Sequence, residues 1–193
     1  MYKIQRNIKI DINADKVWEL LSKPAHLELF HPFCDKNQPI VWSEDLPKKD
    51  ILIYHNGLEF EREFLSWIPK KGFELKIGKK DAKKSTVKWE LNSNNKTTDL
   101  SISVTPYTSS KIPKVFYPII FQFHIKPKLN NYLDNVLMGC KYHLEQKAKI
   151  EDINTDLSSI YLTSTQTLPI DVASKKYDSY FSPPVSTDEF DSE

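Results

Sequence analysis

The 193 residues carry 27% charged and 39% hydrophobic side chains with a net charge of +1, so no overall field favours nucleic acid or an anionic membrane as partner. The charge is uneven: residues 1–150 hold 25 Lys and Arg against 17 acids, whereas residues 151–193 hold 2 against 9. We therefore expect a basic folded domain over residues 1–149. An acidic Ser/Thr-rich segment over 150–193 is expected to be largely disordered or draped on the domain.

The N-terminal residues alternate between apolar and polar side chains, which predicts a strand over residues 2–12. Asn13 suits the N-cap of a short amphipathic helix, and Pro24 ends that helix. Residues 25–30 predict one or two further helical turns. The polar stretch 31–39 that follows predicts a loop.

The middle of the chain predicts a series of antiparallel strands joined by turns. Each run alternates apolar and polar residues and ends at a turn signal, such as the hairpin dipeptide Asn56-Gly57. Together with the N-terminal strand they make a seven-stranded meander, interrupted after its first strand by the short helices. The predicted runs are 40–42, 51–55, 58–68, 73–77, 87–91 and 100–104.

A longer helix is predicted after Pro127, because apolar residues recur at helical spacing from Leu129 to Leu144. It is the only sizeable element left to cover the apolar face of the sheet. We therefore expect an α+β fold in which a curved seven-stranded antiparallel sheet grips a long C-terminal helix and encloses space. The apolar run 112–125 is too short to span a bilayer, so no stable membrane insertion is expected. It is a lid or entrance beside the enclosed space, an exposed segment that touches a membrane or a partner, or a buried connection across the end of the sheet.

The strand predicted over residues 58–68 carries a cation on its apolar face. Phe60, Phe64 and Ile68 share that face with Arg62, one of only two arginines in a lysine-rich chain. A guanidinium is a planar fork of five donors that can be buried against a carboxylate or a ligand. Two interpretations stay open: Arg62 pairs with an internal carboxylate, or it anchors a polar group of a ligand.

Four segments, FHPFCDKN, NGLEFEREFLSW, GFELKIG and PKLNNYLDNVLMGCKYHLE, resemble the helix-grip superfamily of START and Bet v 1 domains. The resemblance covers roughly residues 2–147 and is closest to the bacterial polyketide cyclase/dehydrase-like and lipid-transport group. It implies a seven-stranded sheet gripping a long helix, with an apolar ligand held between them. Some members are cyclases or dehydratases and many only bind or carry. No acid–base motif of the cyclases aligns with this chain, which favours binding over catalysis.

The predicted function is therefore binding or carriage of a small hydrophobic ligand, lipid-like or aromatic, in a cavity between sheet and helix. The alternative is a cyclase/dehydratase-type enzyme acting on a polyketide-like substrate, and no catalytic residue is assigned. A third possibility is a protein-interaction role for residues 112–125 or the acidic segment, with no partner identified. The candidate ligand-binding residues are Arg62, Trp42, Tyr54, Phe60, Trp89, Tyr132, His143 and His31.

The pair His31 and Cys34 invites a nucleophile interpretation. No orienting third group lies nearby, so packing and loop hydrogen bonding are favoured.

The histidines and the two cysteines show no metal-ligand spacing, and no metal or cofactor is expected. Cys34 and Cys140 are predicted to be free thiols in a reducing cytosol. The N-terminus lacks the continuous apolar core of a signal peptide, which also favours a cytoplasmic location.

Overall fold

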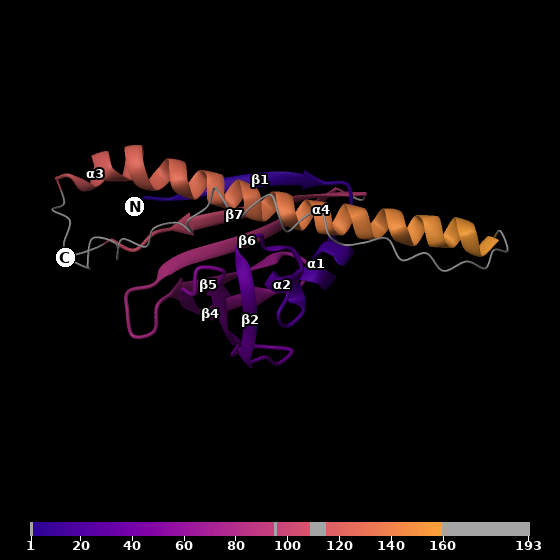
Figure 1. Cartoon of the computed structure of the whole chain (residues 1–193), viewed down its shortest axis with the longest axis horizontal. Coiled ribbons are helices and arrows are strands. Elements are labelled where there is room, and N and C mark those ends of the chain that lie inside the picture. The colour runs from indigo at the N-terminus through magenta and orange to yellow at the C-terminus, as the bar shows by residue number, and fades with distance from the viewer. Residues whose placement is uncertain (1, 95, 109–114, 160–193) are drawn as a thin grey trace.

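The computed structural model describes residues 2–94, 96–108 and 115–159 (Figure 1). Seven strands form one antiparallel sheet in the order β1-β7-β6-β5-β4-β3-β2. The long helix α4 (Lys126–Ser159) runs beside β1 at one side of the sheet, as Figure 1 shows. The predicted α+β architecture is confirmed. The strands are β1 (Ile4–Ile10), β2 (Cys34–Val41), β3 (Lys49–Tyr54), β4 (Glu59–Ile68), β5 (Gly72–Gly78), β6 (Ser85–Asn94) and β7 (Thr97–Thr105).

Two short helices separate β1 from β2, as predicted. Helix α1 (Ala14–Ser22) is capped by Asn13, whose side-chain oxygen accepts a hydrogen bond from the backbone N–H of Lys16 at 3.0 Å. This bond satisfies one of the N–H groups that a helix start leaves open. Helix α2 (Leu27–Phe30) follows and buries its two terminal residues.

Strand β2 corrects the prediction of a loop over residues 31–39. It lies at the edge of the sheet and pairs only with β3, so its outer backbone groups face no neighbouring strand and Pro39 is tolerated there. Its side chains do not alternate in burial, and that is why the strand pattern was absent. Asn37, fully buried, links β2 inward: its backbone N–H donates to Glu28 at 2.7 Å and its side-chain amide donates to the Ile51 carbonyl at 3.4 Å.

Strand β4 corrects the prediction that Ile68 shares the apolar face. A bulge between Phe64 and Ser66 shifts the register against β5. The extra residue inverts the alternation beyond it. Trp67 therefore packs inward, with its ring centroid 5.0 Å from Trp18, whereas Ile68 is 54% exposed.

The long helix begins earlier than predicted. Helix α3 (Tyr117–Ile120) and the π-helical turn η1 (Phe121–Ile125) lead directly into α4. Pro118 lies in the first turn, where its missing N–H costs nothing. The wider turn of η1 precedes Pro127, and the N–H of Lys126 donates to the carbonyl of Phe121 five residues back. A π-helical turn accommodates the proline that would otherwise break the helix.

Helix α4 also reaches Ser159, ten residues into the segment assigned to the acidic C-terminal region, and residues 160–193 lie outside the described part of the chain.

At its centre, α4 approaches α2 closely. A Cβ on Gly139 would meet the backbone oxygen of Phe30 at 2.2 Å, so the contact requires glycine.

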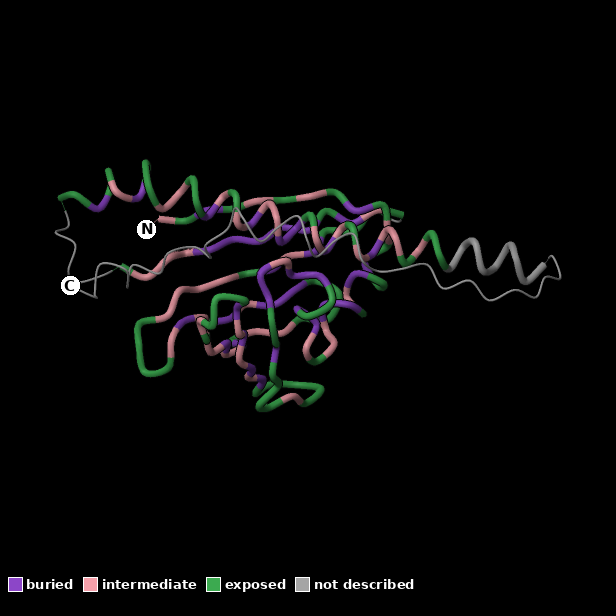
Figure 2. Tube along the Cα trace, in the orientation of Figure 1, coloured by how far each residue is buried: buried purple, intermediate pink, exposed green. Residues whose placement is uncertain are grey.

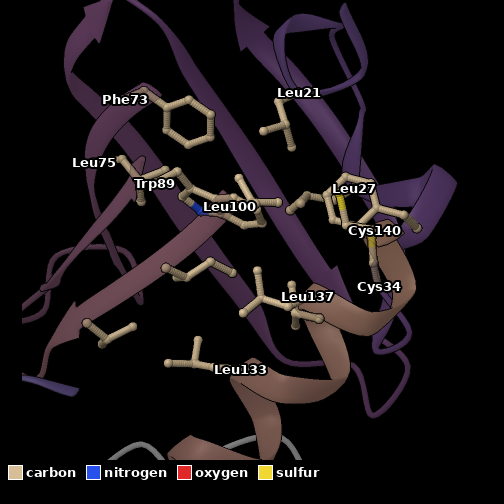
Figure 3. Packing of buried hydrophobic residues seen from close by; sticks show 14 of the residues in the cluster. Leu21, Leu27, Cys34, Phe73, Leu75, Trp89, Leu100, Leu133, Leu137 and Cys140 are labelled. Carbon is tan, nitrogen blue, oxygen red and sulfur yellow. The ribbon is translucent and has the colours of Figure 1, made fainter. Parts of the chain in front are cut away.

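The core lies between α4 and the inner face of the sheet. Figure 3 shows Leu133 and Leu137 of α4 pointing towards Leu100 and Trp89. Buried residues run along the sheet and the inner side of α4 in Figure 2, and exposed residues predominate in the turns. Both predicted free thiols are confirmed: Cys34 and Cys140 are unpaired and buried.

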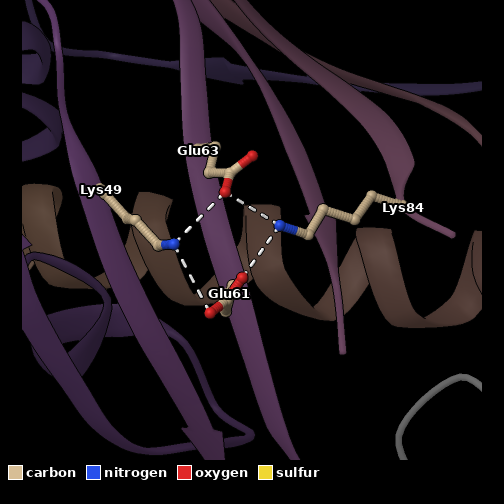
Figure 4. A network of polar contacts seen from close by, with 4 residues as sticks. All are labelled: Lys49, Glu61, Glu63 and Lys84. Atoms are coloured by element: carbon tan, nitrogen blue, oxygen red, sulfur yellow. Dashed lines mark hydrogen bonds and ion pairs between the residues drawn. The ribbon is translucent and has the colours of Figure 1, made fainter. Parts of the chain in front are cut away.

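The outer face of β4 carries a charge network (Figure 4). Lys84 lies 2.9 Å from Glu61 and 3.0 Å from Glu63, and Lys49 bridges the same two carboxylates at 3.5 and 3.3 Å. Hydrogen bonds from Lys84 hold the pKa of both glutamates below the usual range. Glu61 and Glu63 therefore point away from the core, and Arg62 is the only charged residue of β4 on the inner face of the sheet.

Candidate functional site

A cavity of about 160 Å³ lies between α4 and the inner face of the sheet. Its wall is mostly apolar, with buried side chains from both layers. At one end it is bordered by partly or fully exposed residues of the β5–β6 hairpin and of the helix start, including Lys83, His124 and Lys128. We call this end the mouth. The buried apolar wall comprises Leu27, Leu52, Leu75, Ile102, Val104, Leu129, Leu133 and Val136.

Six of the eight residues predicted to bind a ligand line this cavity. They come from β3, β4, β6, α4 and the turn after α2, so the fold gathers side chains that are far apart in the sequence. Alternation places Tyr54, Phe60 and Arg62 on inner strand positions, as the sequence indicated. The six are His31, Tyr54, Phe60, Arg62, Trp89 and Tyr132.

Trp42 and His143 do not line the cavity. Trp42 follows the edge strand β2 and packs against Phe64 and Trp67, with ring centroids 5.4 and 5.9 Å away. His143 lies three turns beyond Tyr132 on α4 and lines a separate surface groove bordered by α1 and α2. Helical spacing alone did not indicate where the cavity ends along α4.

A polar triad of His31, Tyr132 and Tyr54 forms part of the cavity wall. His31 Nδ1 accepts from the backbone N–H of Phe33 at 3.3 Å, so its hydrogen is on Nε2. Nε2 donates to the Tyr132 hydroxyl at 2.8 Å, and that hydroxyl lies 3.0 Å from the Tyr54 hydroxyl. The Nε2–H of His31 and the two tyrosine hydroxyls supply three hydrogens, but only two hydrogen bonds join the members of the triad. One tyrosine hydroxyl keeps a hydrogen that no described residue accepts.

The triad is uncharged at neutral pH. Burial, and then the charge of Arg62, lowers the pKa of His31 to about 3. Burial raises the pKa of Tyr54 to about 12 and raises that of Tyr132 well above its usual value. The triad therefore presents one hydrogen-bond donor to the cavity without presenting a charge.

Arg62 pairs with an internal carboxylate, which confirms the first of the two interpretations left open above. Asp50 is its direct neighbour across β3 and β4, and Arg62 Nε lies 3.3 Å from Asp50 Oδ1. The two side chains are 3% and 0% exposed. Arg62 Nη2 also lies 3.4 Å from His26 Nε2. Burial and the charge of Arg62 lower the pKa of His26 to about 3, so the ring is neutral, and its Nδ1 donates to the Lys23 carbonyl at 2.9 Å, which leaves Nε2 as the acceptor.

The guanidinium is not saturated by these contacts. Arg62 lines the cavity, and its Nη1 finds no hydrogen-bond partner among the described residues. Burial raises the pKa of Asp50, while Arg62 acts to lower it. Asp50 was not predicted as the partner of Arg62, although Asp50, Leu52 and Tyr54 alternate on one strand, which indicates an acid on the inner face. His26 was not predicted either, and no comparable pattern indicates it.

Searches of the solved structures place this geometry among known folds. A START superfamily protein from Mycobacterium smegmatis aligns at a TM-score of 0.59 and 12% identity, over 76% of this chain and 99% of that one. The chain has the helix-grip fold. The allergen Ara h 8.0201 shares it at a TM-score of 0.54 and 12% identity, over 75% of this chain and 98% of that one.

The helix-grip fold is also found in the di-domain ARO/CYC protein BexL of the BE-7585A biosynthetic pathway. The alignment has a TM-score of 0.59 and 11% identity, and covers 75% of this chain and 47% of BexL. No protein-family model and no curated protein sequence matches the chain. The predicted resemblance is therefore confirmed at the level of fold.

Within the described ranges, no helix is both long and apolar enough to cross a membrane. The same ranges contain no group of three His, Cys, Asp or Glu side chains placed to hold a metal ion.

Proposed function

We propose that the chain binds a small hydrophobic ligand in the cavity beneath α4 and recognises a hydrogen-bond acceptor on that ligand. The observation that carries the proposal is the pair of unused donors in an apolar wall: one hydroxyl hydrogen of the Tyr132–Tyr54 pair and Nη1 of Arg62. Cavities that combine an apolar wall with a few convergent polar groups are typical ligand sites.

The size of the cavity limits what it encloses. A buried apolar cavity of roughly 150 Å³ is enough to bind benzene, so about 160 Å³ fits one aromatic ring or a short acyl segment. Removing apolar surface from water contributes about 25 cal/mol per Å². A longer ligand would extend through the mouth.

The polar groups favour a carbonyl or carboxylate over a hydroxyl donor. Both unused groups that line the cavity are donors; the carboxylate oxygens of Asp50 also lack a hydrogen-bond partner among the described residues, but Asp50 does not line the cavity. Leaving a buried donor without an acceptor costs about 1–3 kcal/mol. A ligand oxygen that reaches either donor would remove that cost.

Two probes of nearly equal shape test this proposal. Acetophenone carries a carbonyl oxygen where cumene carries a methyl group. We expect both to bind, with acetophenone about 3- to 10-fold tighter because one net hydrogen bond contributes about 0.5–1.5 kcal/mol. Titration calorimetry and native mass spectrometry of the purified chain provide the measurements. Absence of binding by both probes, together with no co-purifying apolar molecule, would contradict the proposal.

A Tyr132→Phe variant tests the origin of the preference. It removes the hydroxyl that joins His31 to Tyr54, so the acetophenone-to-cumene ratio is expected to change. Tyr142→Phe on the exposed side of α4 is the matched control and should leave the ratio unaltered. An unchanged ratio in Tyr132→Phe would assign recognition elsewhere.

One observation favours the alternative of a cyclase/dehydratase-type enzyme: His31, Tyr132 and Arg62 converge on one cavity. General acid–base catalysis works best when the pKa of the group lies near the working pH. A His31 pKa of about 3 and a Tyr54 pKa of about 12 are both far from neutrality. Incubation with a poly-β-ketone thioester and product analysis by mass spectrometry distinguishes the two functions, and we expect binding without turnover.

A further inference from the structure

The helix start beside the mouth exposes an unusual amount of apolar surface. Val115, Phe116, Ile119 and Phe123 are 80%, 56%, 58% and 78% exposed. The opposite side of the same segment is already packed, since the rings of Tyr117 and Phe121 lie 4.8 and 4.6 Å from that of Tyr2. A helix that is apolar all round is normally buried. Here one side is buried in the protein and the other faces outward.

Basic residues surround this apolar side. Residues 115–133 contain no acid. Lys126 and Lys128 lie three and five residues after Phe123, and no ion pair holds either lysine among the described residues. The β5–β6 hairpin lies at the same end of the molecule as α3 (Figure 1) and contributes Lys79, Lys80 and Lys83 against the single acid Asp81. Residues of both segments border the mouth: Ile120, His124 and Lys128 on the helix, and Lys79 and Lys83 on the hairpin.

We propose that this mouth surface, the exposed side of residues 115–128 with the hairpin 79–83, docks on an anionic lipid bilayer. Exposed aromatic and aliphatic side chains flanked by lysines are suited to the interface of a membrane, where the rings enter the headgroup region and the ammonium groups meet anionic lipids. A protein partner could also cover the apolar side chains, but nothing in the structure specifies such a partner. The excess of positive charge complements an anionic bilayer. Docking there would place the mouth of the cavity against the lipid, although docking itself requires no ligand in the cavity.

Vesicle sedimentation with the full chain tests the proposal without any cavity ligand. The probes are vesicles of phosphatidylcholine alone and vesicles with 30% phosphatidylglycerol. Binding is expected only to the anionic vesicles and should weaken in 0.5 M NaCl, because salt screens the lysines. Lys126→Gln with Lys128→Gln should weaken binding roughly 25-fold, about fivefold per lysine.

The apolar part is tested separately. Phe116→Ser with Phe123→Ser should abolish measurable binding, whereas Met138→Ser with Tyr142→Ser, exposed on α4 away from the mouth, should bind like the parent chain. Circular dichroism establishes that each variant is folded. No binding to anionic vesicles at low salt would overturn the proposal. An equal loss of vesicle binding in the Met138/Tyr142 variant would also overturn it. A concentration-dependent dimer that the phenylalanine variant abolishes would instead assign the surface to a second copy of the chain.

Discussion

The buried pair of Arg62 and Asp50 gives a sharp test of how the two charges are held. The variants are Arg62→Met, Asp50→Leu and the combination of both. The charges lie 3.3 Å apart with side chains 3% and 0% exposed. At an effective dielectric constant of about 20, their attraction is about 5 kcal/mol. Most of it offsets the cost of taking both charges out of water.

Each single variant leaves one charge buried without its partner. We expect each to lower the free energy of unfolding at pH 7 by about 3–5 kcal/mol. The double variant removes both charges and fills the space with apolar atoms but leaves His26 Nε2 without its donor, so it should lie within about 1–3 kcal/mol of the parent chain. Guanidinium chloride denaturation, followed by tryptophan fluorescence, measures all three. If the single variants do not fold, a folded double variant still shows the expected order.

The other arginine provides the control. Arg6 Nε lies 2.6 Å from Asp134 Oδ1, closer than the Arg62–Asp50 contact, but those side chains are 42% and 45% exposed. Exposed ion pairs contribute about 0–1 kcal/mol, so Arg6→Met should cost less than about 1 kcal/mol. The reasoning is refuted if Arg62→Met costs no more than Arg6→Met. It is equally refuted if the two single losses simply add in the double variant.

Two further predictions concern stability. His26 and His31 have folded pKa values of about 3, below the unfolded value of 6.5, so the unfolded chain binds more protons between these values and stability falls as pH drops through this range. The slope should approach about 1.4 kcal/mol per pH unit for each histidine below about pH 6, where the unfolded imidazole is mostly protonated; denaturation at pH 7, 6 and 5 measures it, and a flat profile would contradict it. Gly139→Ala should lower the free energy of unfolding by about 1–3 kcal/mol, because the new Cβ clashes with the Phe30 carbonyl, although alanine normally favours a helix. Thermal unfolding measures the change, and a stabilised variant would show that the helices move apart.

Periodic patterns carried most of the fold prediction. The inner strands alternate clearly because one face packs on α4, and the sheet and helix followed from that requirement. Strand β2 gave no such pattern because it is an edge strand with little apolar surface to bury. The bulge after Phe64 was hidden for a different reason: one extra residue reverses the alternation, and the sequence contains no signal that fixes its position.

The site was predictable where it depends on strand alternation. Arg62 and Tyr54 lie on inner positions of β4 and β3 and do line the cavity. Contacts between distant segments were beyond sequence reasoning. His26 meets Arg62 across 36 positions, and His31 meets Tyr132 across 101. These contacts depend on how α2 and the turn after it are placed against the sheet and α4.

The two interpretations of Arg62 are compatible, because a guanidinium can pair on one side and donate on another. Its Nε faces Asp50, its Nη2 lies near His26, and its Nη1 has no hydrogen-bond partner among the described residues. The Arg62→Met/Asp50→Leu variant therefore does more than test the ion pair. If it keeps the fold, it also removes the Nη1 donor from an intact cavity. Retained affinity for cumene with reduced affinity for acetophenone would then assign acceptor recognition to Arg62, whereas an unchanged ratio of the two affinities would assign it to the tyrosine hydroxyls alone.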